Sequence, residues 1–272
     1  MLTLSKQRKL STTHQAAFLF SCMWPVPLLV FLLALTFPSP CLSDGTSVLE
    51  RCRTERLSYE ISWSGIPAGT ATLETIDNGD GTCSHVLTAR SNPVLDVFYP
   101  VRIHATSTVD ATTGAVMRYT KDAREGWGKH RSVRVDFSRD EKLVRTYSRG
   151  RLKRSLAVPE GVQDPISILY LYRLDPNVAQ SGQIAITDGK RVIHPTLTVH
   201  GTDVTKSPAG AFSTQLLEPH MEGLGGVFAK SPGAKIHLWI SKDEARIPVR
   251  FESEVSVGRF IALLTDYEQT TR

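Results

Sequence analysis

"LSYEISW", from Leu57 to Trp63, alternates apolar and polar side chains without a break. The residues on its apolar face are Leu57, Tyr59, Ile61 and Trp63. Strict alternation of this kind is typical of a strand with one buried face and one solvated face. The stretch therefore predicts a half-buried β-strand.

Glycine-containing turns follow this strand and lead to more segments of the same kind. "GIPAG" (65–69) and "NGDG" (78–81) flank "TATLETI", and glycine supplies the positive φ that tight turns require. Similar short runs continue as "CSHVLTAR", "VRIHATSTVD", "AVMRYTKDAR", "HRSVRVDFS" and "KLVRTYS", and they return as "GQIAITDG", "RVIHPTLTVHG", "AFSTQLLEP" and "GRFIALLTDYE". Successive strands with tight connections indicate an antiparallel sheet and not βαβ units.

One segment carries a helical pattern instead. In "DPISILYLYR" (164–173), Asp164 can cap a helix and Pro165 suits its first turn. The apolar residues at helical spacing are Ile168, Leu169 and Tyr172. A helix of about ten residues needs tertiary contacts to persist, so we place it across one face of the sheet. "NPVLDVFYP" (92–100) is expected to add one helical turn.

These patterns together predict a mainly β fold. The expected architecture is a large curved antiparallel sheet, either a half-barrel or an open barrel, with one short central helix packed against it. "IHLWISKDEARIPVRFESEV" (236–255) fits as two strands, because Ile236, Leu238 and Ile240 alternate with His237 and Trp239. The charged "SKDEAR" between them is interpreted as a solvated bend and not as a reacting cluster, since a catalytic pair needs a pocket to shift its pKa values.

The N-terminus resembles an export signal. Residues 1–15 contain three basic residues and no acid, and an apolar run follows from Ala16 to Phe37. We expect cleavage before Asp44, which leaves 44–272 as a single exported β-rich domain in the periplasm. The alternative is an inner-membrane anchor formed by 16–37. Lipidation is disfavoured, since Pro40 precedes Cys41 and most of the apolar run follows Cys22.

Charge and cysteine content narrow the functional classes. Residues 1–43 hold three of the 32 basic residues and none of the 27 acidic ones, so the rest carries only +2. A nearly neutral domain gives no whole-molecule argument for nucleic acid. Cys52 and Cys83 could pair in an oxidising compartment, but strands separated by a third lie about 9–10 Å apart, which favours two unpaired cysteines.

No catalytic signature is present in the sequence. It lacks a G-x-S-x-G elbow, a P-loop and an H-E-x-x-H motif. His194 and His200, with Glu218, His220 and Glu222, are residue types that zinc accepts. The first two lie about 20 Å apart on an extended strand, so we expect ordinary surface histidines, no metal and no cofactor. An enzyme acting on an envelope substrate remains a third hypothesis.

Two groups of residues are candidates for binding. Residues 118–154 contain 13 Lys or Arg against five Asp or Glu, which suggests a basic face for an anionic polymer, lipid headgroups or a protein; solvated hairpins are the simpler interpretation. Its candidate contacts are Arg145, Arg149, Arg151, Lys153 and Arg154. Aromatic side chains could instead line an apolar cavity beneath the helix, although most aromatic residues on strands are core. These are Tyr59, Trp63, Phe98, Tyr99, Tyr170, Tyr172 and Trp239.

Four ordered motifs resemble an exported bacterial family, domain of unknown function 3108. They are "YEISWSGIPAGTATL", "DPISILYLYR", "SPAGAF" and "LWISKDEARIPVRFES", and the similarity spans roughly residues 54–268. The resemblance implies an exported, β-rich domain of Gram-negative bacteria and supplies no catalytic residue. More distantly, a curved sheet with a helix in its mouth looks like the half-barrels of lipoprotein carriers.

The resulting hypothesis is a non-enzymatic envelope protein whose curved sheet binds a lipid, an acyl chain or a lipidated partner. The alternative is a packed interaction module that uses the basic face of 118–154, at a membrane surface or on another anionic partner.

Overall fold

The computed structural model describes residues 52–128, 130–174, 184–220, 235–255 and 258–270, and these include thirteen strands of one antiparallel sheet. The predicted export signal, with Cys22 and Cys41, lies outside the described residues. The strands of the first half are β1 (Glu55–Trp63), β2 (Ile66–Asp77), β3 (Thr82–Ser91), β4 (Val101–Asp110), β5 (Val116–Glu125), β6 (His130–Ser138), β7 (Leu143–Ser148) and β8 (Arg151–Ala157). Those of the second half are β11 (Thr196–Ser207), β12 (Gly210–His220), β13 (Lys235–Ser241), β14 (Pro248–Val255) and β15 (Gly258–Gln269).

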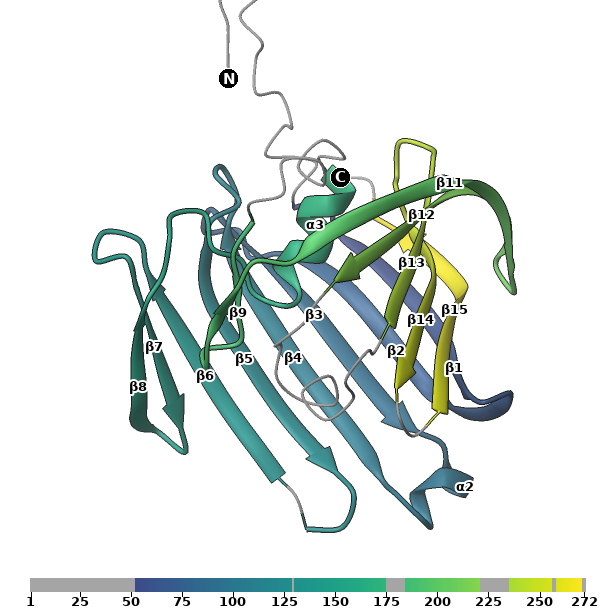
Figure 1. Cartoon of the computed structure of the whole chain (residues 1–272), viewed down its shortest axis with the longest axis horizontal. Coiled ribbons are helices and arrows are strands. Elements are labelled where there is room, and N and C mark those ends of the chain that lie inside the picture. The colour runs from purple at the N-terminus through teal and green to yellow at the C-terminus, as the bar shows by residue number, and fades with distance from the viewer. Residues whose placement is uncertain (1–51, 129, 175–183, 221–234, 256–257, 271–272) are drawn as a thin grey trace, which may run out of the picture. The chain divides into compact units, whose positions relative to one another are not determined.

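The sheet is continuous but not closed. Its order is β11-β12-β13-β14-β15-β1-β2-β3-β4-β5-β6-β7-β8, so β8 and β11 are the edges and β1 pairs with β15 in the middle. Every other pair of neighbouring strands is also consecutive along the chain among the strands of this sheet, as expected for antiparallel strands with short connections. The predicted mainly β, curved open-barrel fold is confirmed, and Figure 1 shows the sheet curling around the central helix.

The helix α3 (Ser167–Leu174) lies in the connection between the two edge strands, together with a small hairpin of β9 (Ile186–Thr187) and β10 (Val192–Ile193). Its predicted apolar stripe was too narrow. Ile168 and Tyr172 pack with Ile186 on one side, whereas Tyr170 packs into the sheet on the other. A helix that is apolar on most sides belongs in the interior.

The main core fills the space between α3 and the inner face of the sheet. Its fully or nearly buried members come from strands on both sides of β1 and include Leu57, Leu73, Ala105, Tyr119, Val135 and Leu264, with Ile166 and Tyr170 from the α3 segment. This confirms the alternation seen around Leu57. A second short helix, α2 (Pro93–Asp96), connects β3 to β4 at the opposite end of the sheet from α3 (Figure 1).

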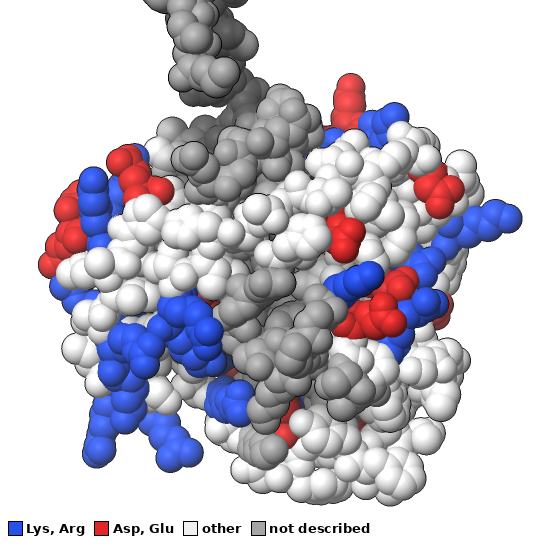
Figure 2. Space-filling view, viewed as in Figure 1, with Lys and Arg blue, Asp and Glu red and all other residues white. Residues whose placement is uncertain are grey.

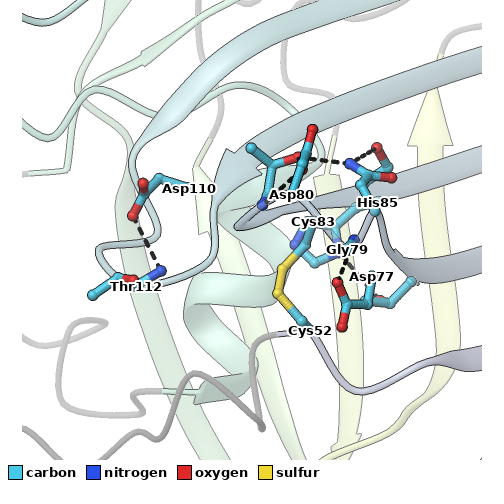
Figure 3. Close-up of a disulfide and its surroundings, with 12 residues drawn as sticks. Cys52, Asp77, Gly79, Asp80, Cys83, His85, Asp110 and Thr112 are labelled. Atoms are coloured by element: carbon cyan, nitrogen blue, oxygen red, sulfur yellow. Dashed lines mark hydrogen bonds between the residues drawn. A yellow bond between two sulfur atoms is a disulfide. The ribbon is translucent and has the colours of Figure 1, made fainter.

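Cys52 and Cys83 form a disulfide, contrary to the expectation of two unpaired cysteines (Figure 3). Their Cα atoms lie 5.4 Å apart. The strand-spacing argument failed because β1 begins only at Glu55, so Cys52 precedes the sheet and is not held at strand spacing. The bridge lies beside the β2–β3 turn, where Asp77 accepts a hydrogen bond of 2.8 Å from the Gly79 amide.

Two smaller expectations were also wrong. The segment 191–201 was predicted as one strand, but it divides into β10 and β11 around Pro195, which cannot donate a backbone hydrogen bond. Of the predicted strand 182–189, the structure describes 184–189, and within that part only the two residues of β9 are extended. The "SKDEAR" segment is a bend, as predicted: Asp243 accepts hydrogen bonds from Ser241 Oγ (2.7 Å) and from the Arg246 amide (3.1 Å).

Candidate functional site

The α3 segment begins at a buried carboxylate. Asp164 Oδ1 accepts hydrogen bonds from the amides of Ile166 (2.7 Å) and Ser167 (3.0 Å), which is the predicted capping role. Ser107 Oγ of β4 donates to its other oxygen at 2.5 Å. Burial raises the pKa of Asp164 even though these hydrogen bonds favour the charged form. The start of the helix is thereby fixed to the sheet.

The C-terminal end of α3 is held by an ion pair inside the protein. Arg173 donates to both carboxylate oxygens of Glu55, at 2.5 and 3.0 Å, and both side chains are at most 7% exposed. It also donates to the backbone carbonyls of Ala245 and Arg246, at 3.1 and 2.9 Å. Burial alone would lower the pKa of Arg173, but the Glu55 carboxylate outweighs it and raises the pKa. One guanidinium therefore joins α3, β1 and the β13–β14 bend.

A neutral histidine packs beside this ion pair. The His85 ring of β3 stacks on Tyr170, with centroids 3.6 Å apart, and its Nδ1 lies 3.1 Å from Thr75 Oγ1. Burial lowers the pKa of His85 to about 3, and the nearby Arg173 adds to this effect. The imidazole is thus uncharged at neutral pH and serves as a packing group.

The cavity at this end of α3 is small. It has a volume of about 80 Å³, and its walls include Glu55, Thr75, Tyr170, Arg173 and Tyr267. Pockets that hold drug-sized ligands typically measure about 300–1,000 Å³. This cavity is therefore too small for an acyl chain.

The inner face continues beyond α3 as a half-buried apolar surface, which we call the distal inner face. It consists of Ile61, Trp63, Ile103 and Phe260, and it borders Leu87 and Phe251, which pack against the core clusters. Register places them on the core side: Ile61 is two residues beyond Tyr59 on β1 and pairs with Ala262, which pairs in turn with Phe251. Trp63 pairs with Phe260, and their rings stack with centroids 6.2 Å apart. The arrangement suits contact with an apolar molecule.

The seven aromatic residues predicted to line one cavity are not brought together. Tyr59 and Tyr170 belong to the packed core, and the Tyr59 hydroxyl donates to the Pro248 carbonyl at 2.8 Å. Tyr172 faces the other side of α3. Phe98 and Tyr99 are exposed on the connection after α2. Only Trp63 lies on the distal inner face.

Trp239 lies on the outer face of the sheet. It pairs with Arg250, Arg250 pairs with Leu263, and Leu263 pairs with Glu60, which is exposed on the side opposite Tyr59. The Arg250 guanidinium carbon stands 4.6 Å from the centre of the Trp239 ring. The alternation between Leu238 and Trp239 in the sequence already separates the two faces.

The predicted basic contacts gather on the β7–β8 hairpin at one edge of the sheet. Arg149, Arg151, Lys153 and Arg154 are exposed, and Figure 2 shows Lys and Arg side chains crowded over this edge. Arg145 instead pairs with Glu141 at 2.6 Å. Basic residues on an edge strand also discourage pairing with a second chain, which accounts for their position without a ligand.

His200 and His220 lie at positions of β11 and β12 on the outer face of the sheet. His200 Nε2 is 2.8 Å from Glu218, and His220 Nε2 is 2.9 Å from Thr198 Oγ1. The hydrogen bond from His200 is the main cause that lowers the pKa of Glu218. Among the described residues, no group of three or more His, Cys, Asp or Glu could hold a metal ion, and no helix is long and apolar enough to cross a membrane.

Inspection of the sequence missed the anchoring residues Glu55, His85 and Arg173. A usable signal exists for Arg173, which follows Ile166 and Tyr170 at helical spacing and so occupies the buried stripe of α3. A charged residue on a buried stripe requires a partner. No comparable signal in the sequence identifies Glu55 as that partner.

The geometry defines a class of protein: a single antiparallel sheet, curled but open, that is filled at one end by a helix and remains apolar at the other. A family model described as "Protein of unknown function (DUF3108)" matches residues 58–265. The chain therefore belongs to this family, and the resemblance seen in its motifs is confirmed.

Comparison with solved structures supports the fold. A β-barrel-like protein of domain of unknown function DUF1849 from Brucella abortus is 11% identical, with a TM-score of 0.53 over 82% of this chain and all of that one. MucB in complex with MucA(peri) is 10% identical over 84% of this chain and 94% of that chain, but a TM-score of 0.13 does not indicate a shared fold. No curated protein matches the sequence.

Proposed function

We propose that this chain is a non-catalytic protein of the cell envelope that binds an apolar ligand, such as an acyl chain or a lipidated partner, against the distal inner face. The observation that carries the proposal is the distal inner face itself, whose apolar side chains, including Ile61 and Phe260, are only half-buried beyond the end of α3. Folded proteins bury such surfaces against something, because each Å² of apolar area removed from water contributes about 25 cal/mol.

The filled space beneath α3 limits where the ligand can bind. The cavity of about 80 Å³ at the C-terminal end of α3 is too small for an acyl chain, so we place the acyl chain along the strands beyond the helix. The disulfide Cys52–Cys83 supports an exported location, since structural disulfides persist in oxidising compartments. The export signal at 1–43 and the periplasmic location are part of the same proposal.

A matched pair of variants on β4 tests this binding site. Ile103 faces inward and is half-buried, whereas the adjacent His104 is exposed on the outer face. Ile103→Gln should weaken binding of a fluorescent fatty acid at least tenfold, because it puts an amide on the apolar surface. His104→Gln should leave the affinity unchanged. Native mass spectrometry of protein purified from its native envelope should also detect less bound lipid in Ile103→Gln than in His104→Gln.

Equal affinity of the two variants, or protein that carries no lipid and binds no probe, would rule the proposal out. Thermal unfolding of both variants provides the folding control. A loss of binding in Ile103→Gln counts only if its far-ultraviolet circular dichroism matches that of the wild type.

A second candidate function is supported by the exposed basic residues of the β7–β8 hairpin. An anionic envelope polymer would contact Arg149, Arg151 and Lys153, which project from an open edge of the sheet. Binding to such a polymer should weaken with salt and should decrease in an Arg149→Ser/Arg151→Ser/Lys153→Ser variant. Salt-independent binding would argue against this candidate.

A further inference from the structure

The end of the sheet opposite α3 carries a set of exposed apolar side chains, which we call the apolar rim. It consists of Ile66, Val94, Val97, Phe98, Tyr99 and Trp127. Ile66 is the first residue of β2, directly after the β1–β2 turn, and the others come from the β3–β4 and β5–β6 connections; Figure 1 shows α2 at this end. They are six of the eleven large apolar residues that are exposed in the described part of the chain, so the exposure is concentrated in one region.

The side chains of the rim project well into solvent. Phe98 is 76% exposed, Trp127 72% and Val94 69%, so none of them contributes much to the core. Single exposed apolar residues are ordinary, but a contiguous group indicates an interaction surface. The fold itself offers no reason for a tryptophan and a phenylalanine at neighbouring turns.

Hydrogen bonds hold the three connections together. Asn92 donates from its backbone amide to Ala68 (2.9 Å) and from its side chain to Pro67 (2.6 Å), which ties the α2 segment to β2. The Gly126 amide donates to Pro100 at 2.8 Å, and the Tyr99 ring lies so close to Gly126 that a Cβ there would clash at 2.5 Å. The rim is therefore a joined structure and not three independent loops.

A row of arginines runs along the outer face beside the rim. Arg90, Arg102 and Arg124 occupy directly paired positions on β3, β4 and β5, and all three are exposed. Like charges directly opposite one another destabilise a sheet. Asp96 of α2 compensates only Arg102, through contacts of 2.9 and 2.5 Å. Repulsion between these arginines therefore destabilises the folded protein, and a bound anionic ligand would reduce this repulsion.

We propose that this end of the sheet is a membrane-contact surface, at which the apolar rim enters the interface of a bilayer while the arginine row binds the phosphates of anionic phospholipids. Two features favour a lipid surface as the occupant. Tryptophan and tyrosine partition to the level of the headgroups, and guanidinium groups bind phosphate in a bidentate manner. The inference goes beyond the proposed function, because a protein without an internal ligand could dock in the same way.

The test uses vesicles of phosphatidylglycerol and phosphatidylethanolamine, with phosphatidylcholine vesicles for comparison. Full-length variants keep one of the four tryptophans, Trp127 or Trp239, and carry Phe at the other three. Acyl chains brominated near the headgroup should quench Trp127 strongly and Trp239, on the outer face, weakly. The leader is the same in both variants, so the difference reports on the rim.

Two further variants separate the apolar rim from the arginine row. Arg90→Gln/Arg124→Gln should weaken binding to anionic vesicles about thirtyfold, at roughly 1 kcal/mol for each charge near the surface. Phe98→Ser should reduce quenching of Trp127 in both kinds of vesicle. Lys206→Gln/Lys242→Gln, at exposed positions on β11 and the β13–β14 bend, is the matched control, with the same loss of charge, and should leave binding unchanged.

Equal quenching of Trp127 and Trp239 would overturn the proposal. An equal loss of vesicle binding in Arg90→Gln/Arg124→Gln and in its matched control would also overturn it. The same holds if the protein binds phosphatidylcholine as tightly as phosphatidylglycerol, or if neither tryptophan is quenched. Capture of a protein through the rim, with no binding to vesicles, would assign the surface to a protein partner instead.

Discussion

Arg173 of α3 and Glu55 of β1 form a bidentate ion pair inside the protein, although 118 residues separate them in the chain. Glu55 lies two residues before the core residue Leu57 on β1, and Arg173 is the penultimate residue of the helix. The pair fixes how α3 covers the sheet, and so where the filled part of the interior ends and the distal inner face starts.

Removing one member of this pair should be costly. Arg173→Met leaves the Glu55 carboxylate buried without its counter-charge and should lower the free energy of unfolding by about 3–5 kcal/mol. The control is Arg56→Met, which breaks the exposed Arg56–Glu74 pair (2.8 Å) one position along β1 and should cost less than about 1 kcal/mol. Urea unfolding measures both. Equal losses would mean that the buried pair does not anchor α3.

The cap of α3 should depend on an oxygen acceptor more than on a charge. Asp164→Ala removes the acceptor for two backbone amides and should lower the free energy of unfolding by about 1–3 kcal/mol. Asp164→Asn keeps one acceptor and should lose less. Because burial raises the pKa of Asp164, the wild type loses stability as pH rises through that pKa. The Asn variant should lack this loss, and a pH series of denaturation midpoints would reveal it.

Acid should destabilise the core through His85. Its pKa falls from 6.5 to about 3 on folding, so neutral His85 stabilises the native state above pH 6.5, and this contribution is lost as pH falls toward 3. His85→Phe keeps a ring against Tyr170 and should flatten the decline in stability between pH 6.5 and 4. His104→Gln, at an exposed histidine, should retain the wild-type slope. Parallel curves for wild type and His85→Phe would contradict the assignment.

The disulfide should contribute substantially to stability. Cys52 and Cys83 are separated by 31 residues, and closing a loop of that length restricts the unfolded chain by about 3–4 kcal/mol. Cys52→Ser/Cys83→Ser should lower the denaturation midpoint accordingly. Reductant should produce the same decrease in the wild type and no further change in the double variant. A reductant-insensitive wild type would show that the cysteines are unpaired in solution.

Local patterns predicted the elements of this fold but not their long-range pairing. Alternation around Leu57 identified β1, and Asp164 with Pro165 identified the start of the helix, because both signals depend on neighbours in the chain. The pairing of β1 with β15 depends on residues about 200 positions apart, as in Leu57 with Tyr267, and no local signal encodes it. The disulfide was misjudged because Cys52 lies before β1, where the spacing between strands does not fix its position.

The candidate site could be predicted less well than the fold. Grouping aromatic residues by type placed Trp63 and Trp239 together, although register puts them on opposite faces. Only the alternation of each strand, combined with the pairing order, distinguishes lining residues from outer ones. Phe98 and Tyr99 lie on a connection, where strand periodicity gives no information about direction.

Ligand-dependent quenching of the two tryptophans on opposite faces tests the central proposal most directly. Variants that keep only Trp63 or only Trp239 are titrated with a fatty acid brominated along its acyl chain, in the absence of vesicles. Binding on the distal inner face predicts saturable quenching of Trp63 and little change at Trp239. Quenching of Trp239 alone, or of neither residue at concentrations at which the fatty acid stays monomeric, would contradict it.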